Sequence, residues 1–460
     1  MVATSSDFDR GDAPELSRAL KPRHVTMITI GGIIGAGLFV GSSVAISATG
    51  PAVVISYALT GLLFMQVMRC LGEMAVSRPE VRSFTDFPRA ALGHWAGFVV
   101  GWLYWYFWII VIPVEAIAGA VIVHQWLPQI PSIVTGTLLV LAMTAVNLMS
   151  TRSYGEFEFW FASIKVVAII AFIAACLAFL TGMFGEHAST TAMWNENSGL
   201  IPKGSIAIIT AIPTIFFSMM GAEISTIAAA ESPDPARAVA RMVSMVVWRI
   251  LFFYLASLSL IVCIVPWGQI KPGVSPFVTA LGYLHIPHAD TIMAAIILTA
   301  VLSCLNSSFY VASRVMFVLA AHGDAPRRLV KLNAKQVPAT SVLMGTVAGL
   351  AGIFAQELAP SAVFAFLVNS SGALIVFIYL MTCVSQVVSR RQLERSGRPV
   401  PEPRTRWFPW TSYAAIAGMG AVLVFMAFNK DMRDEAWASA VSVAIAFGCY
   451  WIRRQRKPGG

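Results

Sequence analysis

The chain has 460 residues, of which 57% are hydrophobic and 12% are charged, against about 25% charged residues in soluble globular proteins. This composition excludes an ordinary soluble enzyme and predicts a protein built mainly of membrane-spanning helices. The formal net charge of +9 would suggest nucleic acid in a soluble protein. Here the basic residues lie between apolar runs, so we interpret them as a topology signal and expect no nucleic-acid partner.

Apolar runs follow one another along the whole chain and predict an all-α polytopic membrane protein with about twelve transmembrane helices, because about 20 apolar residues cross the hydrocarbon core. The predicted spans are residues 25–48, 51–76, 95–126, 131–150, 156–182, 203–230, 243–265, 289–320, 338–357, 361–388, 409–428 and 435–452. Little chain is left outside the lipid bilayer, so we expect no nucleotide-hydrolysing domain.

The lysines and arginines are distributed very unevenly between the two sides of this predicted topology. Of the 32, 27 fall on the side that carries both termini, four fall on the other side, and Lys165 lies inside a span. The positive-inside rule therefore predicts a multi-pass protein with both termini in the cytoplasm.

The first span contains the run GGIIGAGLFVG, residues 31–41, with five glycines in eleven residues. Each glycine costs a helix about 1 kcal/mol relative to alanine, and broken helix at membrane depth is tolerated only where its backbone faces a cavity or a polar ligand. Half-helix ends at the midplane are how many secondary transporters hold small charged substrates. The alternative is that the glycines only let two helices pack closely.

Span 6 has a second candidate break, at Pro213 and again at residues 218–221. Spans 1 and 6 each begin a set of five, which predicts two inverted five-helix repeats whose discontinuous first helices meet at a midplane site. The predicted division is a cytoplasmic tail at 1–24, repeats at 25–182 and 203–388, a cytoplasmic linker at 389–408, peripheral spans at 409–452 and a tail at 453–460.

Three ionisable residues inside the spans are functional candidates, because a charge at mid-bilayer costs about 2.5–3.5 kcal/mol on insertion scales. Lys165 in span 5 lies level with the first break and is a candidate proton carrier, or else half of a fixed internal ion pair. Glu223 in span 6 either couples protons or braces the broken helix, and Glu115 in span 3 either couples protons or compensates for the kink at Pro113.

Cysteine and histidine give no sign of other chemistry. The six cysteines are scattered singly and contain no CxxC pair, so we interpret them as small buried hydrophobes. The histidines lie near span ends or in loops. We therefore expect no metal site, no cofactor and no catalytic centre.

Several long blocks resemble bacterial amino acid permeases of the amino acid–polyamine–organocation superfamily. These blocks are ALKPRHVTMITIGGIIGAGLFVGS, GWLYWYFWIIVIPVEAIAGA, SYGEFEFWFASIKVVAIIAF, GAEISTIAAAESPDPARAV, WRILFFYLASLSLIVCIVPW and CLNSSFYVASRVMFVLAAHGDAP. Within the superfamily the chain most resembles 4-aminobutyrate permeases. The resemblance implies a leucine-transporter-like core of ten helices plus two peripheral helices in a bacterial inner membrane, and secondary active uptake of an amino acid, favouring proton symport and 4-aminobutyrate.

The resemblance also implies roles for particular residues. Free amides near Ala36 and Gly37 would hold the substrate carboxylate, and the carbonyls of Ile33, Phe217 and Met220 would meet its ammonium group. Phe217 would be an aromatic gate, and Lys165 matches a lysine that replaces a sodium ion in proton-coupled relatives. The expected substrate-binding set is Ile33, Gly35, Ala36, Gly37, Phe217, Met220 and Gly221.

Two features depart from the family pattern. Ala36 stands where many relatives have Ser or Thr, and EVRSFTDFP lacks a glycine that relatives often place before the SF. The open alternatives are an amino acid exchanger or a broader α-amino acid permease on the same fold, a non-transporting amino acid sensor, and a passive channel.

Overall fold

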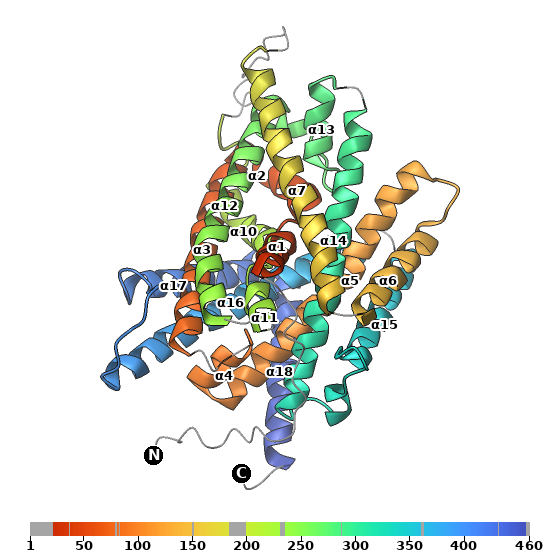
Figure 1. Ribbon diagram of the computed structural model, residues 1–460. Helices are drawn as coiled ribbons and strands as arrows, with labels where there is room; N and C mark the ends of the chain where they lie inside the picture. The colour runs from red at the N-terminus through yellow and green to blue at the C-terminus, as the bar shows by residue number, and fades with distance from the viewer. Residues whose placement is uncertain are drawn as a thin grey trace.

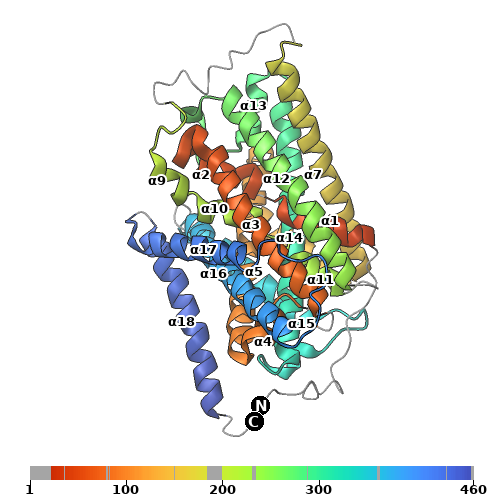
Figure 2. The same ribbon diagram turned by 90° about the vertical axis from the view of Figure 1, so that its left-hand side faces the viewer.

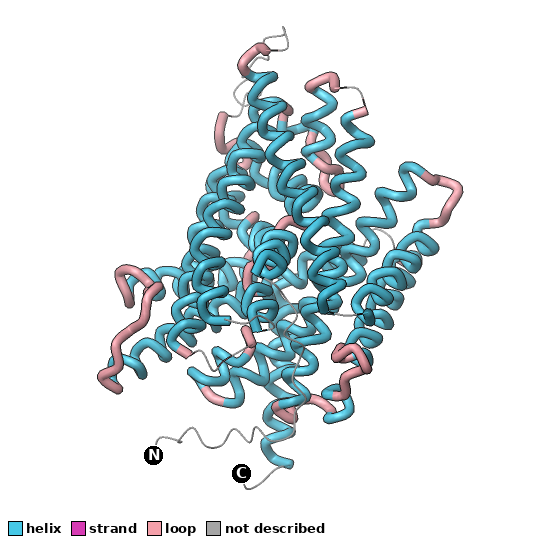
Figure 3. The backbone as a smooth tube through the Cα atoms, in the orientation of Figure 1, coloured by secondary structure: helices cyan, strands magenta, loops and turns pink. Residues whose placement is uncertain are grey.

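The computed structural model covers the 460 residues and describes residues 22–35, 37–78, 81, 83–149, 151–183, 199–230, 235–286, 288–359, 363–430 and 432–456. Ala36 lies outside these residues. Every regular element in the described part of the chain is a helix (Figure 3). The predicted all-α class is therefore confirmed.

The helices, in chain order, have the following bounds: α1 Pro22–Ile33, the π-helix η1 Gly37–Gly41, α2 Ser42–Thr49, η2 Gly50–Ala52, α3 Val53–Ser77, α4 Asp86–Leu92, α5 His94–Trp126, α6 Ser132–Met149, α7 Thr151–Leu180, α9 Ser205–Thr210, α10 Ile212–Met219, α11 Ile224–Ala230, α12 Pro235–Ile264, η3 Trp267–Gln269, α13 Pro276–Tyr283, α14 Ala289–Ala321, η4 Arg327–Val330, α15 Ala339–Leu358, α16 Val363–Arg395, α17 Trp410–Phe428 and α18 Arg433–Arg456.

Among the described residues, ten helical segments are long and apolar enough to cross a membrane. One of them, Thr26–Ser77, contains both predicted spans 1 and 2, and the shorter apolar stretch Leu251–Ile264 of α12 corresponds to span 7. The predicted spans thus match helices, with shifted ends. The largest shifts are that α12 begins at Pro235, eight residues early, that α16 continues to Arg395, into the predicted linker, and that α7 begins at Thr151, five residues early.

The two predicted breaks are confirmed. In the first span α1 ends at Ile33 and helix resumes at Gly37, while in the sixth span α10 ends at Met219 and α11 begins at Ile224. A smaller interruption at Ala211 separates α9 from α10. Pro213 lies in the first turn of α10, where its missing N–H costs no hydrogen bond.

The break in the first span lies in the interior of the bundle, where Ile33, Ile34 and Leu38 are buried. Figure 1 shows α1 nearly end-on at the centre, and α1 contacts α7, α11, α12 and α14. Figure 2, turned by 90°, shows α18 leaning away at one edge beside α17. The arrangement places both helix breaks where surrounding helices can supply polar partners.

At one end of the bundle, Asp324 ties together three segments that are distant in sequence. Its buried carboxylate, just after α14, accepts hydrogen bonds from Arg89 of α4 and Arg453 of α18, and lies 2.8 Å from Nε2 of His94 at the start of α5. Burial alone raises the pKa of the Asp324 carboxyl, but Arg89 and His94 outweigh burial, so its pKa lies below the ordinary value. The carboxylate therefore stays charged at neutral pH.

We expect Asp324→Asn to destabilise the protein by about 2 kcal/mol, because the neutral amide loses charge-assisted hydrogen bonds to two guanidinium groups. Since the folded-state pKa is depressed, the stabilisation is present at neutral pH and disappears as the pH falls through that pKa. Thermal unfolding in detergent at pH 7 measures the effect. Asp290→Asn, at an exposed position in the first turn of α14, is the control, and equal melting temperatures for the two variants would contradict the prediction.

Candidate functional site

The two helix breaks are packed directly against each other, glycine against backbone. Gly221 has φ of +117°, and a Cβ built on it would lie 2.5 Å from the carbonyl carbon of Gly32. A Cβ built on Gly37 would lie 2.6 Å from Cα of Ser218. The glycines are therefore needed both for the break and for close packing, so the two interpretations of the glycine run apply together.

The four helix ends at this point carry opposite partial charges. α1 and α10 end here with their carbonyl ends, whereas η1 and α11 begin here with their amide ends. Some of these groups already have backbone partners, since the amides of Leu38 and Phe39 donate to the carbonyl of Gly35. At the start of α11, Glu223 already accepts a hydrogen bond from the Gly221 amide at 3.0 Å, and from the hydroxyls of Tyr104 at 3.2 Å and Tyr379 at 2.8 Å. The amide end of η1 at Gly37 is thus the positive helix end that remains for a ligand.

A small buried cavity of about 20 Å³ lies between the breaks, lined by Gly32, Ile33, Gly35, Gly37, Trp108, Val111, Glu115, Phe217, Ser218, Met220 and Cys304. Five of the seven residues predicted to bind substrate are in this wall. Gly221 is not in the wall but packs on Gly32, and Ala36 is outside the described residues. Since about 10–15 Å³ on this measure accommodates one water molecule, an amino acid enters only if the breaks separate.

Glu115 reaches this cavity from α5 and is almost completely buried, at 2% exposure. A Cβ on Gly35 would lie 3.1 Å from Sγ of Cys304 and 3.7 Å from Oε1 of Glu115. The carboxyl group therefore faces the first break. This placement brings an acidic side chain into the wall, in addition to the backbone amides and carbonyls that the sequence suggested.

Phe217, the predicted aromatic gate, is 9% exposed, and its ring centroid lies 6.1 Å from that of Phe107 on α5. It lines the cavity together with Trp108. Phe217 thus lies at the cavity, where an aromatic gate would have to lie. That its side chain opens and closes the cavity remains a prediction.

Lys165 on α7 is fully buried and points at the first break. Its Nζ donates hydrogen bonds of 2.7 Å to the carbonyl of Gly31 and of 2.7 Å to Oγ of Ser303 on α14. The Ser303 hydroxyl in turn donates to Glu158. Among the described residues no carboxylate is within ion-pair distance of Nζ, so a hydroxyl relay connects the lysine to an acid instead of a direct ion pair.

Glu158 is a residue that the sequence analysis missed. It is fully buried on α7, and Asn306 and Ser307 of α14 face the same carboxyl group. It was missed because span 5 was predicted to begin at residue 156, which puts Glu158 at the membrane surface. The helix begins at Thr151, so this acid lies inside it, and the rule for ionisable residues in spans would have found it with the correct boundary.

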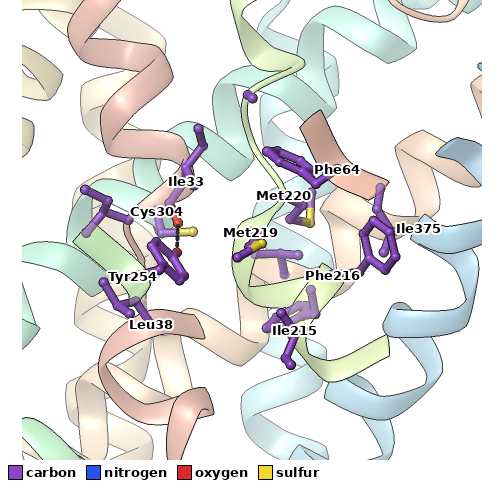
Figure 4. Close-up of a cluster of buried hydrophobic side chains, with 14 of the residues drawn as sticks. Ile33, Leu38, Phe64, Ile215, Phe216, Met219, Met220, Tyr254, Cys304 and Ile375 are labelled. Atoms are coloured by element: carbon purple, nitrogen blue, oxygen red, sulfur yellow. Dashed lines mark hydrogen bonds between the residues drawn. The ribbon is translucent and has the colours of Figure 1, made fainter. Parts of the chain in front are cut away.

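Two buried tyrosines near the breaks were also missed. The Tyr254 hydroxyl, from α12, lies 3.0 Å from the carbonyl oxygen of Ile33 (Figure 4) and 2.6 Å from that of Ser218. Tyr57 of α3 lies behind it, with its hydroxyl 3.3 Å from Oγ of Ser218 and the two tyrosine ring centroids 5.8 Å apart. The only available signal was that a buried tyrosine hydroxyl usually has a partner.

No group of three His, Cys, Asp or Glu side chains arranged to hold a metal ion is present among the described residues.

Discontinuous helices whose ends meet at a buried cavity are typical of secondary transporters. The chain matches the "Amino acid permease" family model over residues 24–455 and belongs to that family. It is therefore a multi-pass membrane protein that transports amino acids, and it is not an enzyme.

Individual relatives cover almost the whole chain. The gamma-aminobutyric acid permease of Bacillus subtilis (strain 168) is 43% identical over 443 residues, which is 96% of this chain and 94% of that protein. The gamma-aminobutyric acid permease of Escherichia coli (strain K12) is 42% identical over 440 residues, 95% and 93% of the two chains. Among solved structures, a mutant manganese transporter of Eremococcus coleocola matches with a TM-score of 0.59 at 12% identity, covering 94% and 93%. This last similarity concerns the fold alone.

We expect Gly37→Val to reduce substrate binding more than tenfold while the protein still folds, because the new side chain would meet Ser218 backbone atoms and occupy the amide end of η1. Binding measured by thermal shift tests this. Gly448→Val is the matched control, because a Cβ at this glycine of α18 meets nothing within 4 Å. Unchanged affinity in Gly37→Val would refute the assignment of the site.

Proposed function

We propose that the protein is a secondary active importer that carries 4-aminobutyrate across the bacterial inner membrane by proton symport. The observation that supports the proposal most directly is the pair of helix breaks, which present an amide end and two carbonyl ends to one buried cavity. Relatives named gamma-aminobutyric acid permeases at 42–43% identity favour this substrate.

The two ends of the substrate would bind different backbone groups. Its carboxylate would lie at the amide end of η1, at Gly37, where the helix dipole is positive. Its ammonium group would lie at the carbonyls of Ile33 and of the end of α10, where the dipoles are negative. Glu115, facing Gly35, offers a carboxyl group beside the first break as a further polar partner. A flexible zwitterion with separated charges suits these contacts.

Proton coupling would depend on Lys165. Its two hydrogen bonds join α7 to the broken span and to α14, so losing a proton weakens the contact that holds these elements together. The Ser303 hydroxyl and Glu158 provide a route by which the proton leaves: Nζ gives a proton to Oγ as Oγ gives its own to the carboxylate. Desolvation at this depth makes the lysine able to lose its proton.

The proposed orientation puts both termini in the cytoplasm, with 27 of the 32 basic residues on that side. The structure supports this in one respect. Arg89, Asp324 and Arg453, which the sequence places on the terminal side, are in contact with one another.

We expect 4-aminobutyrate to compete strongly with radiolabelled 4-aminobutyrate for uptake into proteoliposomes, and lysine to compete weakly. The reason is that the carbonyl ends and Glu115 serve the single ammonium group of 4-aminobutyrate, while the residues lining the cavity include no second acidic side chain for the extra amine of lysine. The measurement is a competition panel with an imposed pH gradient. If 4-aminobutyrate competes no better than lysine, the substrate assignment is wrong and a broader α-amino acid permease replaces it.

We expect Lys165→Met, which is neutral and similar in volume, to abolish accumulation driven by a pH gradient but to retain substrate exchange. Uptake with and without the gradient, compared with counterflow, measures the two activities separately. Lys271→Met, in an exposed loop, is the control. Wild-type dependence on the gradient in Lys165→Met would make this lysine structural, and Glu115→Gln and Glu223→Gln would then be tested as coupling residues.

A further inference from the structure

We propose that the hydroxyl of Tyr254 is a built-in substitute for the substrate's ammonium group. In the packed arrangement it bonds the Ile33 carbonyl, which the ammonium group would bind, and the Ser218 carbonyl at the end of α10, and it must withdraw when substrate binds. This inference rests on the proposed function, because it assumes that the ammonium group is bound at the ends of α1 and α10.

One phenol connects both breaks. Its oxygen lies 3.0 Å from the carbonyl of Ile33, in the first broken span, and 2.6 Å from the carbonyl of Ser218, in the second. Ile33 also accepts a hydrogen bond of 3.1 Å from the Gly35 amide, so both lone pairs of its oxygen are used. An ammonium group that binds Ile33 must therefore displace a donor, and the phenol is the donor that is not part of the local backbone turn.

The chemistry of the two donors explains why the displacement favours substrate. A phenol has one proton, which the two carbonyls share, whereas an ammonium group has three protons and a positive charge. Charge-assisted hydrogen bonds are about twice as strong as neutral ones, and the C-terminal ends of α1 and α10 favour a cation. The hydroxyl is thus strong enough to satisfy the buried carbonyls and weak enough to be replaced.

This exchange of donors matters for the transport cycle. The cavity of about 20 Å³ is too small for an amino acid, so the packed arrangement is the one that an unloaded carrier passes through. Without the hydroxyl, that arrangement would bury two carbonyls that have each lost a donor, which is unfavourable. Tyr254 therefore lowers the barrier for the return of the unloaded carrier and competes with substrate for binding.

The packing around Tyr254 fixes its ring, and the neighbouring hydroxyl of Tyr57 does not bond the carbonyls that Tyr254 binds. The Tyr254 ring is fully buried on α12, a helix without a break, so separation of the broken spans moves the carbonyls relative to it. Tyr57 contacts that ring, but its hydroxyl meets Oγ of Ser218 rather than a carbonyl. Tyr57→Phe is consequently a matched control, since it removes a neighbouring hydroxyl of the same kind.

The test compares Tyr254→Phe with Tyr57→Phe in three assays with 4-aminobutyrate: equilibrium binding, counterflow exchange and net uptake into substrate-free proteoliposomes. We expect Tyr254→Phe to bind substrate roughly tenfold more tightly, the factor that corresponds to about 1.4 kcal/mol for one competing hydrogen bond. Exchange should stay within about twofold, because it bypasses the unloaded carrier, whereas net uptake should fall about tenfold. Tyr57→Phe should change neither the affinity nor the ratio of exchange to net uptake.

Weaker binding by Tyr254→Phe would overturn the proposal, because the hydroxyl would then be a direct ligand of the substrate. An equal loss of exchange and net uptake would overturn it as well. Failure of the proposed function is distinguishable, because the wild-type protein would then not bind 4-aminobutyrate. In that case the three assays are run with the amino acid that the wild type does bind.

A second measurement applies if Tyr254→Phe does not fold. With 3-fluorotyrosine at position 254, the ¹⁹F resonance should shift when 4-aminobutyrate is added, because the hydroxyl loses its carbonyl partners. The same label at position 57 should shift less. A resonance at position 254 that does not respond to saturating substrate would contradict the displacement.

Discussion

Backbone groups freed at a helix break inside a bilayer have no water to bond, and each one left unpaired costs several kcal/mol. The arrangement around the two breaks follows from this constraint. The carbonyl of Gly31 is bound by Lys165, that of Ile33 by Tyr254, and the amide of Gly221 by Glu223. Each partner is a polar side chain that would be expensive to bury elsewhere. The breaks and the buried polar residues therefore stabilise each other.

The same bonds give the site its ability to change. Lys165 comes from α7 and Tyr254 from α12, so the bonds connect broken spans to continuous helices. A proton lost from one side chain, or a donor supplied by a ligand, alters a contact between these two kinds of element. Because the interior is otherwise closely packed, such a local change is expressed as a movement of whole helices rather than a gradual deformation.

The sequence was informative about local features and much less so about contacts between distant segments. The glycines from 31 to 41 and the interruption near Gly221 predicted the breaks, because a poor helix former acts on its own segment. Glu158 and Tyr254 were missed for different reasons. The first depended on a helix boundary that was five residues wrong, and the second lies in an apolar run where only its partners, more than 30 residues away, reveal its role.

The glycines of the first broken span allow close packing against several different helices. A Cβ on Gly32 would meet Ile224 of α11 at 2.6 Å, one on Gly35 would meet Cys304 of α14 at 3.1 Å, and one on Gly37 would meet Ser218 of α10 at 2.6 Å. Each glycine thus leaves a different face of the same span without a side chain. Because no side chain of the span projects at these three positions, the span can shift there against α11, α14 and α10 without interlocking side chains. That freedom is what a broken central span requires if its two halves are to move during transport.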